Sequence, residues 1–287
     1  MQLVIITGLS GSGKSVALNV LEDADYYCVD NLPVSLSADT VRFLRTNHWT
    51  RVAITVDARS GSDLSALTDI LADLRNESID VRLVYLNARS ESLVRRFKET
   101  RRKHPLSDGT RTIDECIARE ATLVGPLAES AHVIDTSELS PNALRAWIRD
   151  LVEVKSDTLT LVFESFGFKN GLPLNADFVF DVRHLPNPFY DPRLCAFTGL
   201  QDPIIGFMQA QPDAQTLIAD IGDFIARWLP GYQRDNRAYL TVAIGCTGGQ
   251  HRSVFIAEQL ASRFRGSKPV LVRHRQLALP ALAIAYD

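Results

Sequence analysis

Eight residues near the start of the chain have the spacing of a phosphate-binding loop. They follow a short apolar run over residues 3–7 and are Gly8, Leu9, Ser10, Gly11, Ser12, Gly13, Lys14 and Ser15. Glycines let backbone N–H groups turn around a phosphate, and the start of a helix adds partial positive charge. In such a loop Lys14 reaches the β and γ phosphates, and the Ser15 hydroxyl ligates Mg²⁺. The pattern predicts a site for ATP or GTP with Mg²⁺. The alternative is a glycine-rich turn that has only a structural, packing role.

A magnesium site of this kind also needs a carboxylate at the end of a neighbouring strand. Asp57 follows the apolar run over residues 52–56 and is our candidate, and Asp30, which ends another strand-like run, competes with it. Either carboxylate could instead cap the next helix.

The segment over residues 89–103 is rich in cations. It carries Arg89, Arg95, Arg96, Lys98, Arg101, Arg102 and Lys103 against Glu91 and Glu99. Small-molecule kinases of the P-loop fold close an arginine-bearing lid here, but a solvated helix face or a docking surface for a polyanion fits as well. No residue stands out as a base for an acceptor, so the loop alone predicts nucleotide binding and not phosphotransfer.

A second glycine-containing loop lies near residue 246, again between a strand-like run and a helix-like run. Its candidate anion-binding residues are Cys246, Thr247, Gly248, Gly249, His251, Arg252 and Ser253. Cys-x5-Arg-Ser is the spacing of cysteine-dependent phosphatases, in which a helix N-terminus and an arginine lower the cysteine pKa. A pocket for a phosphate or sugar phosphate and a structural turn are the other two interpretations, and the pocket is the one we favour.

Two further residues are candidates for this second pocket. Asp181 lies at the end of the strand-like run over residues 178–182 and Arg183 follows it, and a parallel sheet would bring both to the same edge as Cys246. Asp181 could accept hydrogen bonds from sugar hydroxyls, and Arg183 could pair with phosphate.

The end of the chain carries a local cluster of cations in an otherwise slightly acidic protein. The candidate RNA-binding residues are Arg263, Arg265, Lys268, Arg273, His274 and Arg275. A solvated surface stripe is the alternative. Because 31 Lys and Arg face 34 Asp and Glu, the chain as a whole offers no electrostatic argument for nucleic acid.

The elements that must position these loops are read from hydrophobic periodicity. In the first half, strands are predicted at residues 3–7, 26–29, 51–56, 81–86 and 131–135, with helices at 14–23, 63–77, 91–102 and 112–130. In the second half, strands are predicted at 158–164, 178–182, 239–244 and 269–272, with helices at 212–228 (stopped by Pro230) and 251–264. The prediction is an α/β protein with a parallel-sheet P-loop domain over residues 1–154 and a second α/β domain over residues 155–287.

Composition limits the class of protein. The hydrophobic content of 46% is that of a soluble globular chain, and no stretch is long enough to span a membrane. The four cysteines are scattered without a C-x-x-C pair, so we expect reduced thiols in the cytoplasm and neither a zinc site nor a disulfide framework. The apolar start is too short for a signal peptide.

Five motifs in order resemble the RapZ/YvcJ family of bacterial P-loop nucleotide-binding proteins. They are the loop at Gly8–Ser15, Cys28-Val29-Asp30-Asn31-Leu32-Pro33, Phe163-Glu164-Ser165-Phe166-Gly167-Phe168-Lys169, Phe180-Asp181-Val182-Arg183 with Leu185-Pro186-Asn187-Pro188, and Ile244-Gly245-Cys246-Thr247-Gly248-Gly249 with His251-Arg252-Ser253. The resemblance covers nearly the whole chain.

The resemblance implies a kinase-like nucleotide-binding domain with weak ATP and GTP hydrolysis. Its nucleotide sites fall on Gly8–Ser15 and on Asp57, Ala58, Arg59 and Ser60. It also implies a C-terminal domain that binds glucosamine-6-phosphate, a phosphorylated amino sugar, and an adapter role toward small regulatory RNA and a ribonuclease. We therefore expect a cytoplasmic homo-oligomer that regulates amino-sugar metabolism.

This chain differs from the enterobacterial members in two places. Residues 276–283 are apolar where those members end in a lysine- and arginine-rich tail, and Phe189 stands where they have a histidine beside the ligand pocket.

Overall fold

The computed structural model describes residues 1–59, 64, 66–153, 159–234, 237 and 239–277. The chain divides into two compact units, residues 1–157 and 158–287. The division falls among residues 154–158, which lie outside the described part of the chain. Each unit has a hydrophobic core of its own, built on one parallel sheet and the helices packed against it.

The sheet of the first unit contains five parallel strands in the order β2-β3-β1-β4-β5. Their bounds are β1 Gln2–Gly8, β2 Tyr27–Val29, β3 Arg51–Thr55, β4 Asp80–Asn87 and β5 His132–Asp135. The central strands β1, β3 and β4 are almost wholly buried, which agrees with their continuous apolar, β-branched runs. Because every strand is parallel, all their carboxyl ends meet at one edge of the sheet, where the phosphate loop begins.

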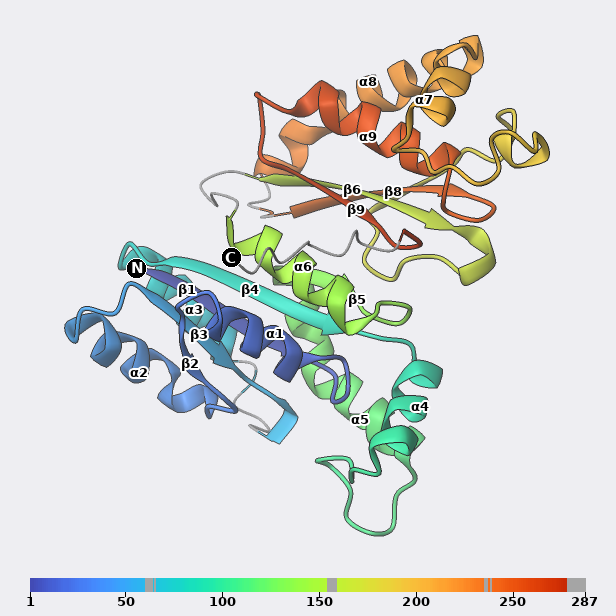
Figure 1. Cartoon of the computed structure of the whole chain (residues 1–287). Coiled ribbons are helices and arrows are strands. Elements are labelled where there is room, and N and C mark those ends of the chain that lie inside the picture. The colour runs from blue at the N-terminus through green and yellow to red at the C-terminus, as the bar shows by residue number, and fades with distance from the viewer. Residues whose placement is uncertain (60–63, 65, 154–158, 235–236, 238, 278–287) are drawn as a thin grey trace, which may run out of the picture. The chain divides into compact units, whose positions relative to one another are not determined.

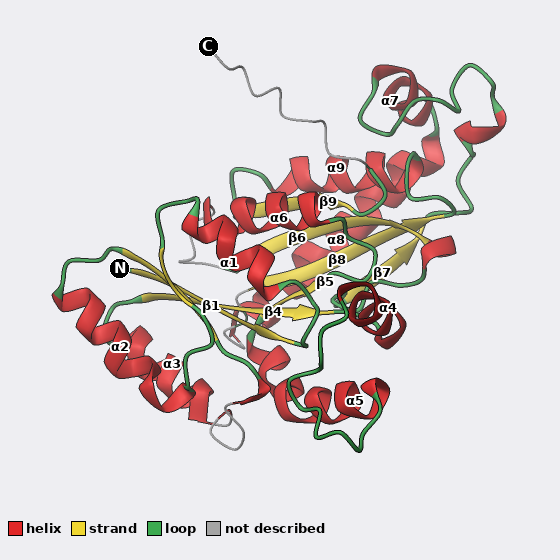
Figure 2. Ribbon diagram, turned by 60° about the horizontal axis from the view of Figure 1, so that its bottom comes forward, coloured by secondary structure: helices red, strands yellow, loops and turns green. Residues whose placement is uncertain are grey.

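Helices cover both faces of this sheet (Figures 1 and 2). They are α1 Lys14–Glu22, α2 Val34–Thr46, α3 Leu67–Asn76, α4 Ser90–Thr100, α5 Ile113–Val124 and α6 Pro141–Glu153. The predicted helix over 112–130 is in fact two elements, because Gly125 and Pro126 start a 3₁₀ turn, η2 Gly125–Ser130. Proline lacks the N–H that the α-helix would need there. The helices α2 and α6 were not predicted.

The second unit has four parallel strands in the order β7-β8-β6-β9. They are β6 Thr160–Gly167, β7 Phe178–Asp181, β8 Tyr239–Cys246 and β9 Val270–His274. Three helices, α7 Asp202–Gln209, α8 Pro212–Arg234 and α9 Arg252–Phe264, lie on one face of this sheet (Figure 1). The short turns η3 Phe168–Asn170 and η4 Pro188–Tyr190 follow β6 and β7.

The helix α8 corrects the predicted stop at Pro230. It continues through that proline to Arg234. A proline removes one helical hydrogen bond, but Ile221, Ile225 and Leu229 bury one face of α8 in the core, and this packing outweighs the local preference. No described helix is long and apolar enough to cross a membrane.

Candidate functional site

The phosphate loop lies between β1 and α1, as predicted, and its glycines are needed for its shape. Gly8, Gly11 and Gly13 have φ angles of 125°, 84° and 109°, which side-chain-bearing residues rarely adopt. A Cβ on Gly8 would lie 2.0 Å from the Leu86 carbonyl oxygen of β4. The loop is therefore held against the central strands with only glycine able to make the first turn.

The polar groups of this loop fit an anion. Lys14 lies at the start of α1, and its Nζ donates to the Gly8 carbonyl oxygen at 2.7 Å, so the ammonium folds back over the loop. Burial lowers the Lys14 pKa, and the charges of Glu120, Asp57 and Asp30 oppose that shift. The Ser12 hydroxyl is buried and has no hydrogen-bond partner within the described residues. Ser15 is exposed, so its hydroxyl is accessible to a ligand.

A buried carboxylate, which the sequence did not reveal, binds the loop from α5. Glu120 is 0% exposed. Its two oxygens accept from the Ser10 N–H at 2.8 Å and the Ser10 hydroxyl at 2.7 Å. His104 lies 3.1 Å away through its Nε2. Burial would raise the Glu120 pKa, but the hydrogen bonds from His104 and Ser10 hold it below its ordinary value. Glu120 therefore stays charged beside the loop.

The α4 segment also binds the loop, through Arg96. Its guanidinium donates to the Gly11 carbonyl oxygen at 3.0 Å and to the Thr136 hydroxyl at 3.1 Å. Thr136 in turn donates to the Ser12 carbonyl oxygen at 2.9 Å. Arg96 therefore supports the backbone of the loop, and in this arrangement it is not a lid residue poised over phosphates.

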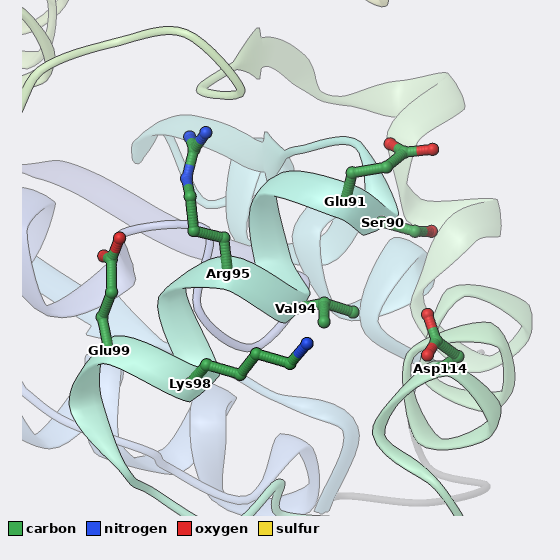
Figure 3. Close-up of a pocket in the computed structure, with 7 residues that line it drawn as sticks. All are labelled: Ser90, Glu91, Val94, Arg95, Lys98, Glu99 and Asp114. Atoms are coloured by element: carbon green, nitrogen blue, oxygen red, sulfur yellow. The ribbon is translucent and has the colours of Figure 1, made fainter.

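Two more cations of the predicted lid, Arg95 and Lys98, lie among carboxylates. A depression of about 510 Å³ lies between α4 and the start of α5. Figure 3 shows Lys98 extending toward the side of Asp114, whereas Arg95 points upward from α4. The other charged residues that line it, Glu91 and Glu99, are acidic. Three carboxylates against two cations do not make a phosphate site.

The predicted magnesium carboxylate, Asp57, lies just beyond the end of β3 and is 5% exposed. Its oxygens accept from the Arg59 backbone N–H and Nε, each at 2.9 Å. The competing Asp30 accepts from the Thr55 hydroxyl at 2.5 Å. Both carboxylates act electrostatically on Lys14, so both lie in its neighbourhood. Ala58 is buried, and Ser60 lies outside the described residues.

No cluster of three or more His, Cys, Asp or Glu that could hold a metal is found in the described part of the chain. Ser15 and Asp57 would supply one hydroxyl and one carboxylate for Mg²⁺, and phosphates and waters would have to supply the rest, as is usual for this ion.

The second loop leaves the end of β8 and enters α9. Cys246 is 2% exposed, and its sulfur accepts from the Gly249 N–H at 3.2 Å and lies 3.1 Å from the Ser253 Oγ. Burial disfavours the thiolate, but the hydrogen bonds from Ser253 and Gly249 and the charge of Arg252 together lower the Cys246 pKa. Gly249 has a φ of 75°, and a Cβ there would lie 2.6 Å from the Gly167 nitrogen.

Arg252 joins this loop to the segment that follows β7. Its Nη1 donates to the carbonyl oxygens of Arg183 and Leu185, each at 2.8 Å, and its Nη2 lies 3.3 Å from the Thr247 hydroxyl. Arg252 is 3% exposed, and its Nε has no hydrogen-bond partner among the described residues. The structure thus brings the loops after β7 and β8 together at one edge of the sheet.

Asp181 and Arg183 are bound to each other, with Oδ2 and Nη2 2.6 Å apart. The Arg183 guanidinium also stacks 4.0 Å from the Phe168 ring centroid. The hydrogen bonds from Arg183 lower the Asp181 pKa. Both residues are exposed, as is Phe189 at the predicted pocket.

The remaining loop residues differ in exposure. Thr247 is exposed, Gly248 is half-buried and His251 is buried. His251 Nε2 has no hydrogen-bond partner within the described residues. Sequence reasoning left out Lys169, an exposed cation whose backbone N–H donates to the Thr247 carbonyl oxygen at 3.3 Å. The sequence offered one signal for Lys169, because it is the last residue of the family motif over residues 163–169.

The predicted RNA-binding residues do not form one exposed basic face. Arg263 pairs with Asp223, and Arg265 pairs with Glu258. Arg275 is bound to buried Glu164 at 2.9 Å, and His274 lies between Ser165 and Glu258. Arg273 is 1% exposed, and Lys268 is half-buried. Acidic partners from elsewhere in the unit, which periodicity could not show, offset much of this charge.

The comparisons with known proteins agree with the two-unit architecture. A model described as the RapZ-like N-terminal domain matches residues 1–156, and one described as the RapZ C-terminal domain matches residues 159–278. A nucleotide-binding protein of Nitrosomonas europaea is 55% identical over 280 residues, 97% of each chain. One from Thiobacillus denitrificans is 54% identical over 278 residues, covering 97% of this chain and 100% of its own.

Among solved structures, the shikimate kinase of Bacteroides thetaiotaomicron is 15% identical with a TM-score of 0.37, covering 53% of this chain and 98% of its own. A deoxyadenosine kinase of M. mycoides is 12% identical with a TM-score of 0.34, covering 53% of this chain and 99% of its own. Because family models match both units and relatives are more than half identical along nearly the whole length, the chain belongs to the RapZ family of nucleotide-binding proteins.

Proposed function

We propose that the protein is a regulator that binds ATP or GTP with Mg²⁺ in its first unit and a phosphorylated amino sugar, glucosamine-6-phosphate, in its second. The observation that carries the proposal is the presence of two separate loops, each running from a parallel strand into a helix and each holding a basic side chain, Lys14 or Arg252. Both loops therefore present a helix N-terminus and a cation to an anion.

Equilibrium titration of the whole chain with ATP or GTP tests the first site. Lys14→Ala is expected to weaken binding at least tenfold, because the ammonium that folds over the loop is lost. Lys98→Ala removes an exposed cation from α4 and is expected to leave the affinity unchanged. Equal affinities of the two variants would contradict the assignment.

A turnover assay separates the regulator from the rival function, a P-loop kinase. Rapid turnover with a small-molecule acceptor that is lost in Lys14→Ala would indicate the kinase. If the protein is a regulator, we expect only slow hydrolysis of the nucleotide.

Calorimetric titration with glucosamine-6-phosphate tests the second site. Arg252→Lys keeps a positive charge but loses the planar fork that joins the loops after β7 and β8, so affinity is expected to fall. Arg193→Lys is the matched control, because Arg193 is exposed and forms a local ion pair with Asp191, two residues before it. Binding that survives unchanged in Arg252→Lys would remove this loop from the site.

We propose further that the protein binds small regulatory RNA and presents it to a ribonuclease, a role supported by membership of the RapZ family. Filter binding with structured RNA at two salt concentrations tests it. Saturable binding that weakens steeply with salt is expected, because neutralising phosphates releases counterions. Absence of binding at low salt would contradict the RNA role and would not affect the proposals for the two small-ligand sites.

A further inference from the structure

The sulfur of Cys246 has the surroundings of a nucleophile. It lies at the end of β8, accepts the Gly249 N–H, and is hydrogen-bonded to the Ser253 hydroxyl seven residues along the chain. Both groups stabilise a thiolate, and the positive charge of Arg252 acts in the same direction. A loop that only binds an anion does not need hydrogen bonds that stabilise a thiolate, because a thiolate would add a negative charge where the phosphate binds.

Arg252 connects the sulfur to the facing loop. Its Nη1 bonds to two carbonyl oxygens of the segment after β7, while its Nε is buried without a partner in the described part of the chain. A buried N–H without an acceptor is costly, and a phosphate oxygen would satisfy it. The sulfur, the arginine and the start of α9 therefore form a set on which a phosphoryl group could be held next to Cys246.

We propose that the loop from Cys246 to Ser253 carries a phosphotransfer activity, in which Cys246 takes the phosphoryl group from compounds whose leaving group is stable as an anion, such as aryl and acyl phosphates. This inference rests on the proposed function, because it uses the anion-binding loop to which we assign the sugar phosphate.

The reaction takes place in two balanced steps. The Cys246 thiolate attacks phosphorus, so an S–P bond forms and the bond from phosphorus to the leaving oxygen breaks, with the electron pair departing on that oxygen. Water then attacks phosphorus, the S–P bond breaks, and the thiolate and inorganic phosphate are released. The proton of the water goes to solvent, and no oxidant or reductant is needed.

The restriction to stable leaving groups follows from Asp181. It is the carboxyl at the end of β7, where the facing loop begins, and the hydrogen bonds from Arg183 hold its pKa below the ordinary value. A carboxylate that stays ionised cannot protonate a departing alkoxide. A sugar phosphate, whose leaving group is an alkoxide, is therefore bound without being cleaved, whereas a phenolate or carboxylate leaves unaided.

The test uses the full-length protein and p-nitrophenyl phosphate. We expect slow release of nitrophenolate that falls to background in Cys246→Ser and is unchanged in Cys195→Ser, because the Cys195 thiol is exposed and its hydrogen bond goes to the Pro192 carbonyl oxygen, outside the loop. Acid quenching followed by intact-mass measurement should show one phosphoryl adduct in the parent protein and none in Cys246→Ser. Equal turnover in the two cysteine variants would overturn the proposal.

A second readout covers the case in which Cys246→Ser disturbs the fold. Ser253→Ala removes one hydrogen bond to the sulfur, so the midpoint of iodoacetamide labelling of Cys246 should move to higher pH. An unchanged midpoint would contradict the stabilisation of the thiolate by Ser253.

Glucosamine-6-phosphate should compete with p-nitrophenyl phosphate and release no phosphate, and its cleavage would overturn the leaving-group rule. Sugar-phosphate binding without any turnover of p-nitrophenyl phosphate would overturn this inference alone, whereas absent binding would overturn the proposed function.

Discussion

At the scale of single residues, Glu120 decides how the phosphate loop is held. Glu120→Ala would leave the Ser10 N–H, the Ser10 hydroxyl and His104 without their acceptor in a buried place. We expect a loss of about 3 kcal/mol in the free energy of unfolding, which denaturant titration at pH 7 would measure. Glu129→Ala, at an exposed position, is the control and should change stability by less than about 0.5 kcal/mol. Similar losses in the free energy of unfolding for the two variants would contradict the role of Glu120 as a buried hydrogen-bond acceptor for the loop.

The same residue gives a pH dependence whose sign is fixed by its lowered pKa. A carboxyl with a folded pKa below its unfolded value stabilises the fold above the unfolded value, near 4.5, and loses this contribution as pH falls through the folded pKa. The stability difference between the parent protein and Glu120→Gln should therefore shrink as the pH is lowered below about 4.5. Denaturant titrations from pH 7 to pH 3 would measure it, and a difference that grew on acidification would contradict the assignment.

At the scale of elements, α5 carries Glu120, and a capping box fixes where that helix begins. The Thr112 hydroxyl accepts from the Glu115 N–H at 3.3 Å, and the Glu115 carboxylate accepts from the Thr112 N–H at 2.8 Å. Thr112→Ala should lower the free energy of unfolding by about 1 kcal/mol. Thr122→Ala, on an exposed turn of the same helix, should change it by less than about 0.5 kcal/mol, and equal losses would contradict the cap.

The helices and strands also show how much of the fold the sequence predicts and why the remaining contacts could not be predicted. Strands such as β1 and β4 were predictable because burial on both faces demands continuous apolar runs. The helix α6 was missed, although Leu144, Trp147, Ile148 and Leu151 follow helical spacing and were an available signal. The glycine loops were predictable from local spacing. The Ser10–Glu120 contact was not, because it joins residues 110 positions apart that only the folded sheet brings together.

At the scale of the whole molecule, the two proposed anion sites lie in units that each have a separate core. A ligand stabilises the unit that binds it by RT ln(1 + [L]/Kd), about 2.7 kcal/mol at a hundred times Kd. Differential scanning calorimetry should resolve two transitions, with Mg²⁺-ATP raising one and glucosamine-6-phosphate raising the other. Lys14→Ala should abolish only the first shift, and Arg252→Lys should reduce only the second. If either ligand raised both transitions equally, the units would be energetically coupled, and binding at one loop would change the stability of the unit that holds the other.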